Sequence, residues 1–435
     1  MIDIWLSRGP KTRRRWTGGA CVAASLMLAL TGCSGSDDDS SSTATATAAG
    51  GSGVAAVVNA ANAFLGTLSG DEKKQAQLEF TKANATAWSN LPCGSSCRVG
   101  VQFGTLTDAQ VAAGKKVLQA ALGTSTGTGY DQAMKILLAD EYLGSVQGSQ
   151  GGAPGGGPSG AAGGPAGGVP GGGGPSGGPP GGIPSGAAPG GAIPSGAAPG
   201  GAMPSGAAPG GGGPGGAGSG YSNDSYFLAM LGTPSVTGTW QLHFGGHHLA
   251  VDLTYSAGKV AGASPFFIGV EPTSWTADGQ TYAPLDIMRD GMVKLTGSLS
   301  SAQLAKAKLA KSYTDVLLGP GQDGQFPAKK EGLAVSELSE AQKTLVLNAI
   351  KPWVSVVDDA TSTALMSTYK SELDKTYIAY SGGTGLTAHA DYVRIDGPSV
   401  WVEFVCQNGI VIQGKIHYHT IYRDHTRDYG GELSF

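Results

Sequence analysis

The chain has 435 residues and a formal net charge of −4, from 28 lysines and arginines against 32 aspartates and glutamates. With no basic stripe after the N-terminal segment, this balance argues against nucleic acid as a partner. No segment after residue 32 is apolar for long enough to span a bilayer.

Residues 1–32 have the pattern of a lipoprotein signal peptide. A basic stretch ending at Arg15 precedes an apolar run over residues 20–30, which is too short to be retained as a spanning helix. The run leads into Leu-Thr-Gly-Cys, ending at Cys33, which resembles the lipobox of bacterial lipoproteins. We therefore expect lipid attachment at Cys33 and a membrane partner through that anchor. The residue directly after Cys33 is Ser34 and not an aspartate, and this favours the outer membrane in a Gram-negative host.

After a flexible tether over residues 33–53, residues 54–146 have the pattern of helices. Cys93 and Cys97 lie in this part and are expected to form a local disulfide, because exported thiols at short spacing usually oxidise. A zinc knuckle would need two more soft ligands nearby, and none is present. Cys406 lies in an apolar run and is predicted to be a buried small hydrophobic residue rather than a nucleophile.

Three segments share the helix-start signal Leu-[Ser/Thr]-x-x-Gln, beginning at Leu106, Leu299 and Leu338. In this signal the hydroxyl caps the helix, and the glutamine three residues later reaches back to the cap. We interpret these glutamines as folding signals rather than functional groups.

Residues 147–220 are almost entirely Gly, Pro, Ala and Ser, with a repeat of ten residues. Such a segment has no apolar surface to bury and is predicted to be disordered. We expect it to act as a spacer or an expanded loop. Binding of a surface or a matrix by the repeats is the alternative.

Residues 221–435 are predicted to form the α+β part of the domain, and it carries the histidine clusters. The predicted elements are strands over 238–244, 247–255, 399–406 and 410–422, with helices around 285–312 and 340–380. Asn408-Gly409 predicts a hairpin turn between the last two strands. The expected fold is an antiparallel sheet packed with helices and interrupted by the disordered Gly/Pro-rich insertion.

Two histidine clusters suggest a metal site. His417 and His419 are separated by one residue, and in a strand such residues point to the same face, where two imidazoles can bind one ion. His247 or His248 could supply a third ligand. Consecutive strand residues point opposite ways, so only one of these two is expected to join. Glu403 lies among apolar neighbours, where a carboxylate needs a partner or an ion.

The same segments resemble a known family, the bacterial domain-of-unknown-function family number 3500. The resemblance rests on residues 238–249 (Gly-Thr-Trp-Gln-Leu-His-Phe-Gly-Gly-His-His-Leu), 265–272 and 392–398, followed by His-x-His-x-x-x-Arg-Asp at 417–424 and Asp-Tyr-Gly at 428–430. It covers about 54–146 and 221–435. The Gly/Pro insertion and the Cys93/Cys97 pair depart from the pattern, and neither touches the histidine clusters. No activity comes with the resemblance.

Imidazoles together with a carboxylate suit zinc, copper or iron. Zinc would activate water for hydrolysis, with Glu403 or Asp424 as the base and Arg423 steadying negative charge. Copper or iron would instead indicate oxidation chemistry. Arg423 and Asp424 could also form only a structural ion pair. The expected function is an envelope lipoprotein with metal-dependent activity. A metal- or ligand-binding lipoprotein without turnover and an adhesive envelope protein are the alternatives.

Overall fold

The computed structural model describes residues 53–150 and 221–435. The predicted signal peptide, the lipidation site Cys33 and nearly all of the tether lie outside the described residues. So does most of the segment predicted to be disordered over 147–220. The start of that segment is an exception to the prediction, because a helix continues to Gln150.

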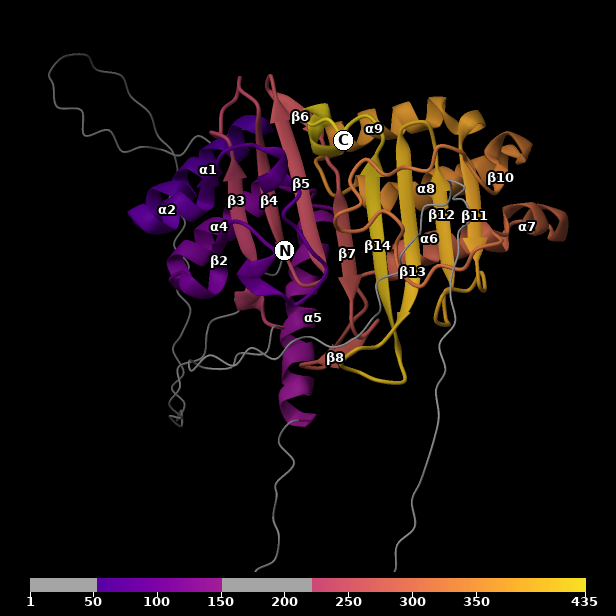
Figure 1. The fold of residues 1–435 in the computed structure, drawn as a ribbon, viewed down its shortest axis with the longest axis horizontal. Coiled ribbons are helices and arrows are strands. Elements are labelled where there is room, and N and C mark those ends of the chain that lie inside the picture. The colour runs from indigo at the N-terminus through magenta and orange to yellow at the C-terminus, as the bar shows by residue number, and fades with distance from the viewer. Residues whose placement is uncertain (1–52, 151–220) are drawn as a thin grey trace, which may run out of the picture. The chain divides into compact units, whose positions relative to one another are not determined.

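One large sheet forms the centre of the described fold (Figure 1). Its strands are β1 (Gln77–Leu78), β2 (Val101–Gln102), β3 (Phe227–Leu231), β4 (Trp240–Gly246), β5 (Leu249–Ser256), β6 (Lys259–Gly262), β7 (Phe266–Val270), β10 (Leu333–Ala334), β11 (Tyr377–Ser381), β12 (Tyr392–Asp396), β13 (Val400–Asn408) and β14 (Ile416–Asp424). The order along the 12-stranded sheet is β1-β3-β4-β5-β7-β14-β13-β12-β11-β10, with β2 paired to β3 and β6 to β5. A separate hairpin joins β8 (Trp275–Ala277) to β9 (Gln280–Tyr282).

All pairs in the large sheet are antiparallel except β1 with β3. This confirms the predicted α+β class. The sheet is assembled from both sides of the insertion, because β1 and β2 precede it and the other strands follow it. Strands β5, β7, β14 and β13 lie near its middle, which is where both histidine clusters are placed.

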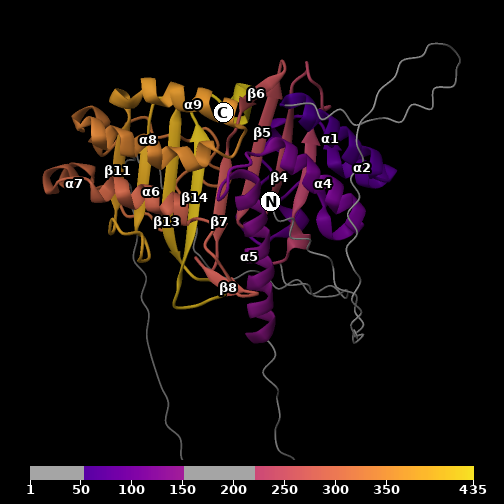
Figure 2. The same ribbon diagram turned by 180° about the vertical axis from the view of Figure 1, so that it is seen from behind.

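The described helices pack on one face of this sheet, except α3 (Lys82–Ala85), which packs with Ala229 and Leu231 of β3 on the opposite face (Figures 1 and 2). They are α1 (Val54–Thr67), α2 (Gly70–Ala76), α3 (Lys82–Ala85), α4 (Asp108–Ala121), α5 (Gly129–Gln150), α6 (Asp286–Gly297), α7 (Ser301–Ala307), α8 (Glu340–Val354) and α9 (Asp359–Ser371). A continuous apolar core joins α1, α4 and α5 to strands β3 to β5, and α6, α8 and α9 to strands β11 to β14. None of the described helices has both the length and the apolar character needed to cross a membrane.

The opposite face of the sheet is covered by two largely irregular segments, residues 79–100 and 308–332. Trp88 from the first segment and Tyr313 and Val316 from the second pack against this face. Phe267, on β7, belongs to the same cluster. The histidines of β14 point to this face, so these two segments form part of their surroundings.

The three sequence-predicted capping boxes are present, at Thr107/Gln110, Ser300/Gln303 and Ser339/Gln342. Two of them also contact each other, because the Gln342 amide donates to Gln303 Oε1 at 3.0 Å. The glutamines therefore act in folding, as predicted, and additionally join the beginnings of α7 and α8.

Two predicted boundaries differ from the structure. The helix predicted over 340–380 is divided into α8 and α9, and residues 377–381 form strand β11, which pairs with β12. The predicted hairpin over 399–422 is present, but residues 409–415 connect its strands, so Asn408-Gly409 is not a two-residue turn. In residues 377–381, the aromatic and β-branched side chains favour a strand over a helix.

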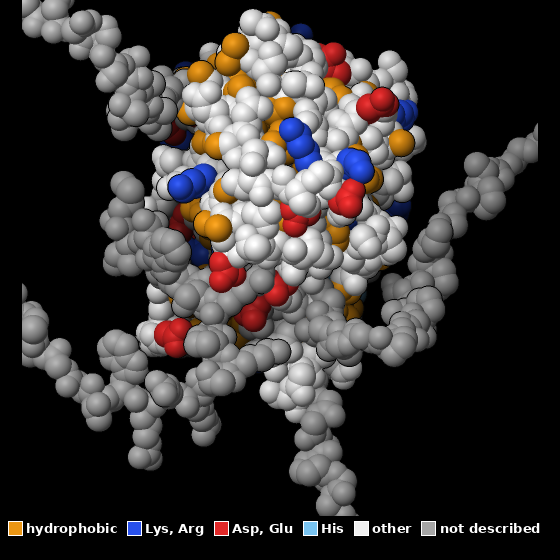
Figure 3. Space-filling view, turned by 90° about the vertical axis from the view of Figure 1, so that its left-hand side faces the viewer, with side chains coloured by type: hydrophobic (Ala, Val, Ile, Leu, Met, Phe, Trp, Pro, Cys, Tyr) orange, Lys and Arg blue, Asp and Glu red, His pale blue; other side chains and the backbone are white. Residues whose placement is uncertain are grey.

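The described surface carries both signs of charge. On the side drawn in Figure 3, basic and acidic side chains are both present, and no broad basic patch covers the visible part of the described residues. This view agrees with the acidic balance of the sequence.

Candidate metal centre

His417 and His419 lie side by side on β14, near the middle of the sheet, and their side chains share one face as their spacing predicts. Their register is fixed by pairing with Gln407 and Val405 of β13. The Nε2 atoms of the two rings are 3.2 Å apart. Two imidazoles bound tetrahedrally to one zinc ion, each at 2.0–2.1 Å, have nitrogens about 3.3 Å apart. The spacing therefore suits a shared ion.

His247 and His248 form the turn between β4 and β5. The turn follows from the pairing of Gly246 with Leu249, and His248 has a positive φ of 61°. The assumed alternation along a strand therefore does not apply to them, although only His248 of the two joins His417 and His419 in a group that could hold a metal. Their rings lie against each other at an angle of 31°, with centroids 3.6 Å apart.

The turn brings His248 to the histidines of β14. The His248 ring centroid lies 5.5 Å from that of His417 and 5.1 Å from that of His419. One nitrogen from each of the three rings lies within 4.8 Å of the others, a grouping that can hold a metal ion. The sequence prediction of a histidine-based metal site is supported to this extent.

The lack of a side chain at Gly269 makes room for two of the rings. Gly269 lies on β7 opposite His419, and its amide donates to the carbonyl of His248 at 2.8 Å. A Cβ atom at this position would lie 2.8 Å from Cδ2 of His419 and 2.9 Å from Cδ2 of His248. Both contacts are closer than carbon atoms tolerate, so the rings need a glycine here.

Replacing Gly269 by alanine should therefore displace the rings of His248 and His419 and weaken metal binding by at least about tenfold, a shift comparable to losing an orienting partner. A zinc titration with a competing chelator measures this. The matched control is Gly297→Ala, since a Cβ at Gly297 meets nothing within 4 Å. If both variants bound zinc as tightly as the wild type, zinc binding would not depend on the packing of His248 and His419 against Gly269.

Burial keeps the imidazoles of His248 and His417 neutral, which is the form that binds metals. It holds the pKa of His248 well below its usual range, with further lowering from His247 and His419. It also lowers the pKa of His417 to about 2, with His419 adding to the effect. The buried Nδ1 atom of His248 has no hydrogen-bond partner. An unpaired buried polar atom of this kind costs about 1–3 kcal/mol.

Asp315, in the segment 308–332, orients His419. Its Oδ1 atom lies 3.0 Å from Nδ1 of His419, and Asn90 approaches the same nitrogen at 3.5 Å. A carboxylate on one ring nitrogen fixes the tautomer that leaves the other nitrogen free for a metal. His419 Nε2 is the atom that faces His417, so the free nitrogen points to the centre. The sequence reasoning did not identify Asp315.

Replacing Asp315 by alanine should lower metal affinity by about 10–100-fold without unfolding the protein, because the ligand ring loses its orienting partner. Isothermal titration with zinc measures the change. The control is Asp374→Ala, whose carboxylate is 72% exposed and pairs with Lys343. An Asp315→Ala protein with unaltered zinc affinity would mean that the contact has no bearing on metal binding.

Glu403, predicted as a ligand, lies outside both groups that could hold a metal. Its two oxygens accept hydrogen bonds from four donors: the amides of Leu317 and Leu318, the Trp401 indole and the Tyr392 hydroxyl. Burial raises the pKa of Glu403, while the hydrogen bonds from both amides lower it. Through the Leu317 and Leu318 amides, Glu403 holds the segment 308–332, which carries Asp315, against strand β13.

Replacing Glu403 by glutamine should lower the free energy of unfolding by about 1–3 kcal/mol. The glutamine NH₂ group is a donor, and it would face donors that now bond to a carboxylate oxygen. Urea denaturation measures this loss. Glu337→Gln, in a pair with Lys306 whose two side chains are 46% and 58% exposed, should change stability little. If Glu403→Gln removed metal with unchanged stability, Glu403 would be a ligand after all.

Arg423 and Asp424, predicted as catalytic residues or as an ion pair, do not pair with each other. They are adjacent on β14 and point to opposite faces. Arg423 is fully buried and forms ion pairs with Asp323 at 3.0 Å and Asp428 at 2.9 Å. Its guanidinium also donates to the Leu318 and Gly319 carbonyls.

The carboxylate of Asp424 also has several partners, on the face of the sheet opposite to Arg423. Its carboxylate accepts hydrogen bonds from the Tyr369 hydroxyl at 2.7 Å and from the Thr426 amide at 2.9 Å, and it pairs with Arg427 at 3.1 Å. Catalytic roles for Arg423 and Asp424 remain predictions, but neither side chain belongs to a group that could hold a metal.

A second group that could hold a metal consists of Asp140, His247 and His248. Asp140 comes from α5, before the insertion, and its Oδ1 atom lies 2.9 Å from Nδ1 of His247. The sequence contained an indication that Asp140 is buried and needs a partner. Asp140 follows Ile136 and precedes Leu143 at helical spacing on the buried face, where an unpaired carboxylate is costly.

The remaining histidines lie apart from the centre. His243 pairs with Asp252 at 2.6 Å, and His425 stacks on Phe326. His389 is exposed. None of the three belongs to a metal-holding group among the described residues.

Cys93 and Cys97 are joined by a disulfide. The neighbouring Arg98 contacts both sulfurs at 3.5 Å and donates to the carbonyl of Gly246, directly before the His247-His248 turn, at 2.7 Å. Cys406 is buried, and burial raises the pKa of its thiol to about 12. The disulfide loop therefore supports the turn that carries two of the four clustered histidines.

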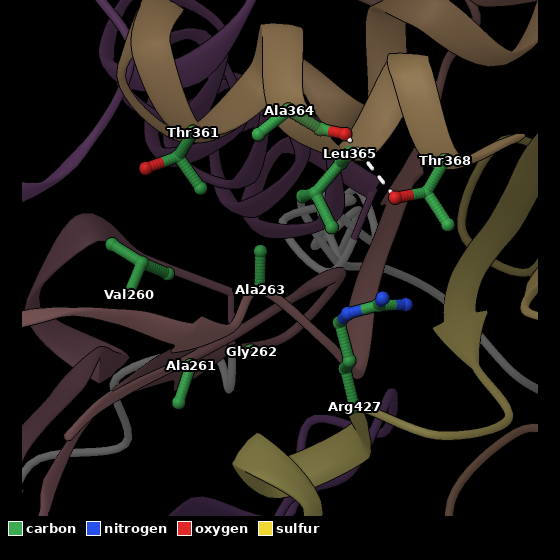
Figure 4. A pocket seen from close by; sticks show the side chains of 9 residues that line it. All are labelled: Val260, Ala261, Gly262, Ala263, Thr361, Ala364, Leu365, Thr368 and Arg427. Atoms are coloured by element: carbon green, nitrogen blue, oxygen red, sulfur yellow. Dashed lines mark hydrogen bonds between the residues drawn. The ribbon is translucent and has the colours of Figure 1, made fainter. Parts of the chain in front are cut away.

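A cavity of about 170 Å³ lies elsewhere, between β6 and α9 (Figure 4). Small and apolar side chains line most of it. Its one charged group, Arg427, is paired with Asp424. Thr368 donates back to the Ala364 carbonyl of its own helix. No histidine lines this cavity, so it is separate from the metal centre.

The family model described as "Protein of unknown function (DUF3500)" matches residues 50–431. The chain belongs to the DUF3500 family. The match covers every histidine, carboxylate and glycine of the centre, and it confirms the resemblance seen in the sequence. No curated protein and no solved structure matches this DUF3500 protein.

Proposed function

We propose that this protein binds a divalent transition metal ion through His248, His417 and His419 and uses it to activate water in a hydrolytic reaction. The observation that supports this most strongly is a buried cluster of three imidazoles. Two of its facing nitrogens are 3.2 Å apart, and a further buried nitrogen has no hydrogen-bond partner.

Zinc is the metal that the donor set favours. Three histidine ligands are typical of catalytic zinc sites, which keep the fourth position for water or substrate. Bound there, zinc would supply a Lewis acid and lower the pKa of water. Asp315 holds His419 in the required tautomer, and its side chain is 44% exposed, so it lies where the centre approaches solvent. Copper and iron also accept imidazole ligands and would give oxidation chemistry.

Metal binding without turnover is the second candidate, and the burial of the ligands favours it. The three rings are at most 4% exposed, which suits retention of an ion more than access of a large substrate. A substrate of the hydrolytic reaction would therefore have to be small or to approach along the side of Asp315 and Asn90.

The test is a set of activated ester, phosphate and amide substrates offered to the zinc-loaded protein. Hydrolysis that a chelator abolishes and added zinc restores, and that is lost in His417→Ala/His419→Ala, would support the enzyme. Tight zinc binding without turnover of any substrate would favour the second candidate.

We also propose that the protein is an exported lipoprotein held at the outer membrane through Cys33. The signal-like sequence supports this, and the Cys93–Cys97 disulfide fits an oxidising compartment. In cell fractionation, the Cys33→Ala protein should leave the membrane fraction. Retention of that variant in the membrane would contradict the anchor.

A further inference from the structure

We infer that the centre holds a second metal ion, bound by Asp140 and His247 and sharing His248 with the first. This inference rests on the proposed metal site, and it makes that site dinuclear. Asp140, His247 and His248 each offer one ligand atom, and these atoms lie within 4.8 Å of one another. All three side chains are buried.

The charge of Asp140 is the first independent argument. This carboxylate is 1% exposed, and its hydrogen bonds are with the Tyr226 hydroxyl at 2.7 Å and His247 at 2.9 Å. No lysine or arginine among the described residues forms an ion pair with it. A buried carboxylate is normally paired with a cation or bound to a metal. A divalent ion at this position would supply the missing positive charge.

The neighbouring guanidinium does not fill that role. Burial lowers the pKa of Arg98, and the nearby Tyr226 and Asp140 partly offset this effect. Its Nη2 group donates to three carbonyls, those of Ser89, Leu91 and Gly246. It therefore stabilises the backbone around the turn and leaves the Asp140 oxygens to Tyr226 and His247.

The second argument is the spacing of the donor atoms. Oδ1 of Asp140 lies 2.9 Å from Nδ1 of His247, close to the separation of about 3.3 Å between two ligand atoms of one tetrahedral zinc ion. An ion held by these two atoms would replace the proton between them, which is released to the solvent.

His248 belongs to both metal-holding groups. Its ring lies against that of His247, with centroids 3.6 Å apart, and its centroid is 5.1 Å from that of His419. A histidine ring has two nitrogens, and the Nδ1 atom of His248 has no hydrogen-bond partner. When each nitrogen binds one ion, the N–H proton is released to the solvent as the second nitrogen–metal bond forms.

The experiment is a count of metal ions per chain on the full-length protein in detergent, by native mass spectrometry after zinc saturation. We expect close to two zinc ions in the wild type, close to one in Asp140→Asn, and two in the control Asp374→Asn. A single ion in the wild type would overturn the second position and leave the proposed function standing. Two ions retained in Asp140→Asn would also overturn it, and no ion at all would overturn both proposals.

Copper(II) provides a measurement that does not depend on a variant that folds. Two copper ions joined through one imidazole should couple magnetically, so the electron paramagnetic resonance signal of the loaded wild type should integrate to far fewer spins than copper ions. One full spin per bound copper would contradict the shared His248.

Discussion

Replacing His417 and His419 together by alanine should lower the affinity for the first zinc ion by more than about 100-fold, a larger loss than removal of an orienting partner causes. Two of the three imidazoles of that ion would be lost, and His248 cannot hold it alone, whereas the second position keeps Asp140, His247 and His248. Competition with a chromophoric chelator measures the affinity, and circular dichroism checks that the variant is folded.

His389→Ala is the matched control, because His389 is exposed and belongs to no metal-holding group among the described residues. Its zinc affinity should equal that of the wild type. If the double variant bound as many zinc ions as His389→Ala, and as tightly, the histidines of β14 would be structural, as in the adhesive alternative.

Replacing Arg423 by methionine should lower the free energy of unfolding by about 3–5 kcal/mol, because it leaves Asp323 and Asp428 buried without their cation. Arg423 is fully buried, and the two carboxylates are at most 10% exposed. Guanidinium denaturation followed by tryptophan fluorescence measures the loss.

Arg289→Met is the comparison, since that arginine is 30% exposed and pairs with Asp290 near the surface. Removal of this ion pair should lower the free energy of unfolding by about 1 kcal/mol or less. Unchanged stability of Arg423→Met together with lost hydrolysis would instead support a role for Arg423 in steadying negative charge, one of the two interpretations drawn from the sequence.

Short-range patterns in the sequence predicted the parts of the site that lie on one element. The shared face of His417 and His419 follows from strand alternation alone. The three capping boxes likewise depend only on residues three positions apart. For His247 and His248 the same alternation failed, because pairing of Gly246 with Leu249 places both in the turn.

The rest of the centre depends on contacts between distant segments, and no local pattern specifies them. Asp140 reaches His247 from α5, across the insertion, and Asp315 reaches His419 from a segment without regular structure. The burial of Asp140 on an apolar helix face could have indicated a partner, but not which one. Glu403 was correctly interpreted as needing partners, and only the fold shows that these are amides and aromatic side chains.

The most direct test of the central claim is X-ray absorption spectroscopy of the zinc-loaded protein, with the zinc content measured on the same sample. We expect stoichiometric zinc with imidazole nitrogens at about 2.0–2.1 Å and no sulfur in its coordination shell. We also expect the imidazole signal to be lost in His248→Ala. No bound zinc after reconstitution, or a shell without imidazole, would contradict the metal centre.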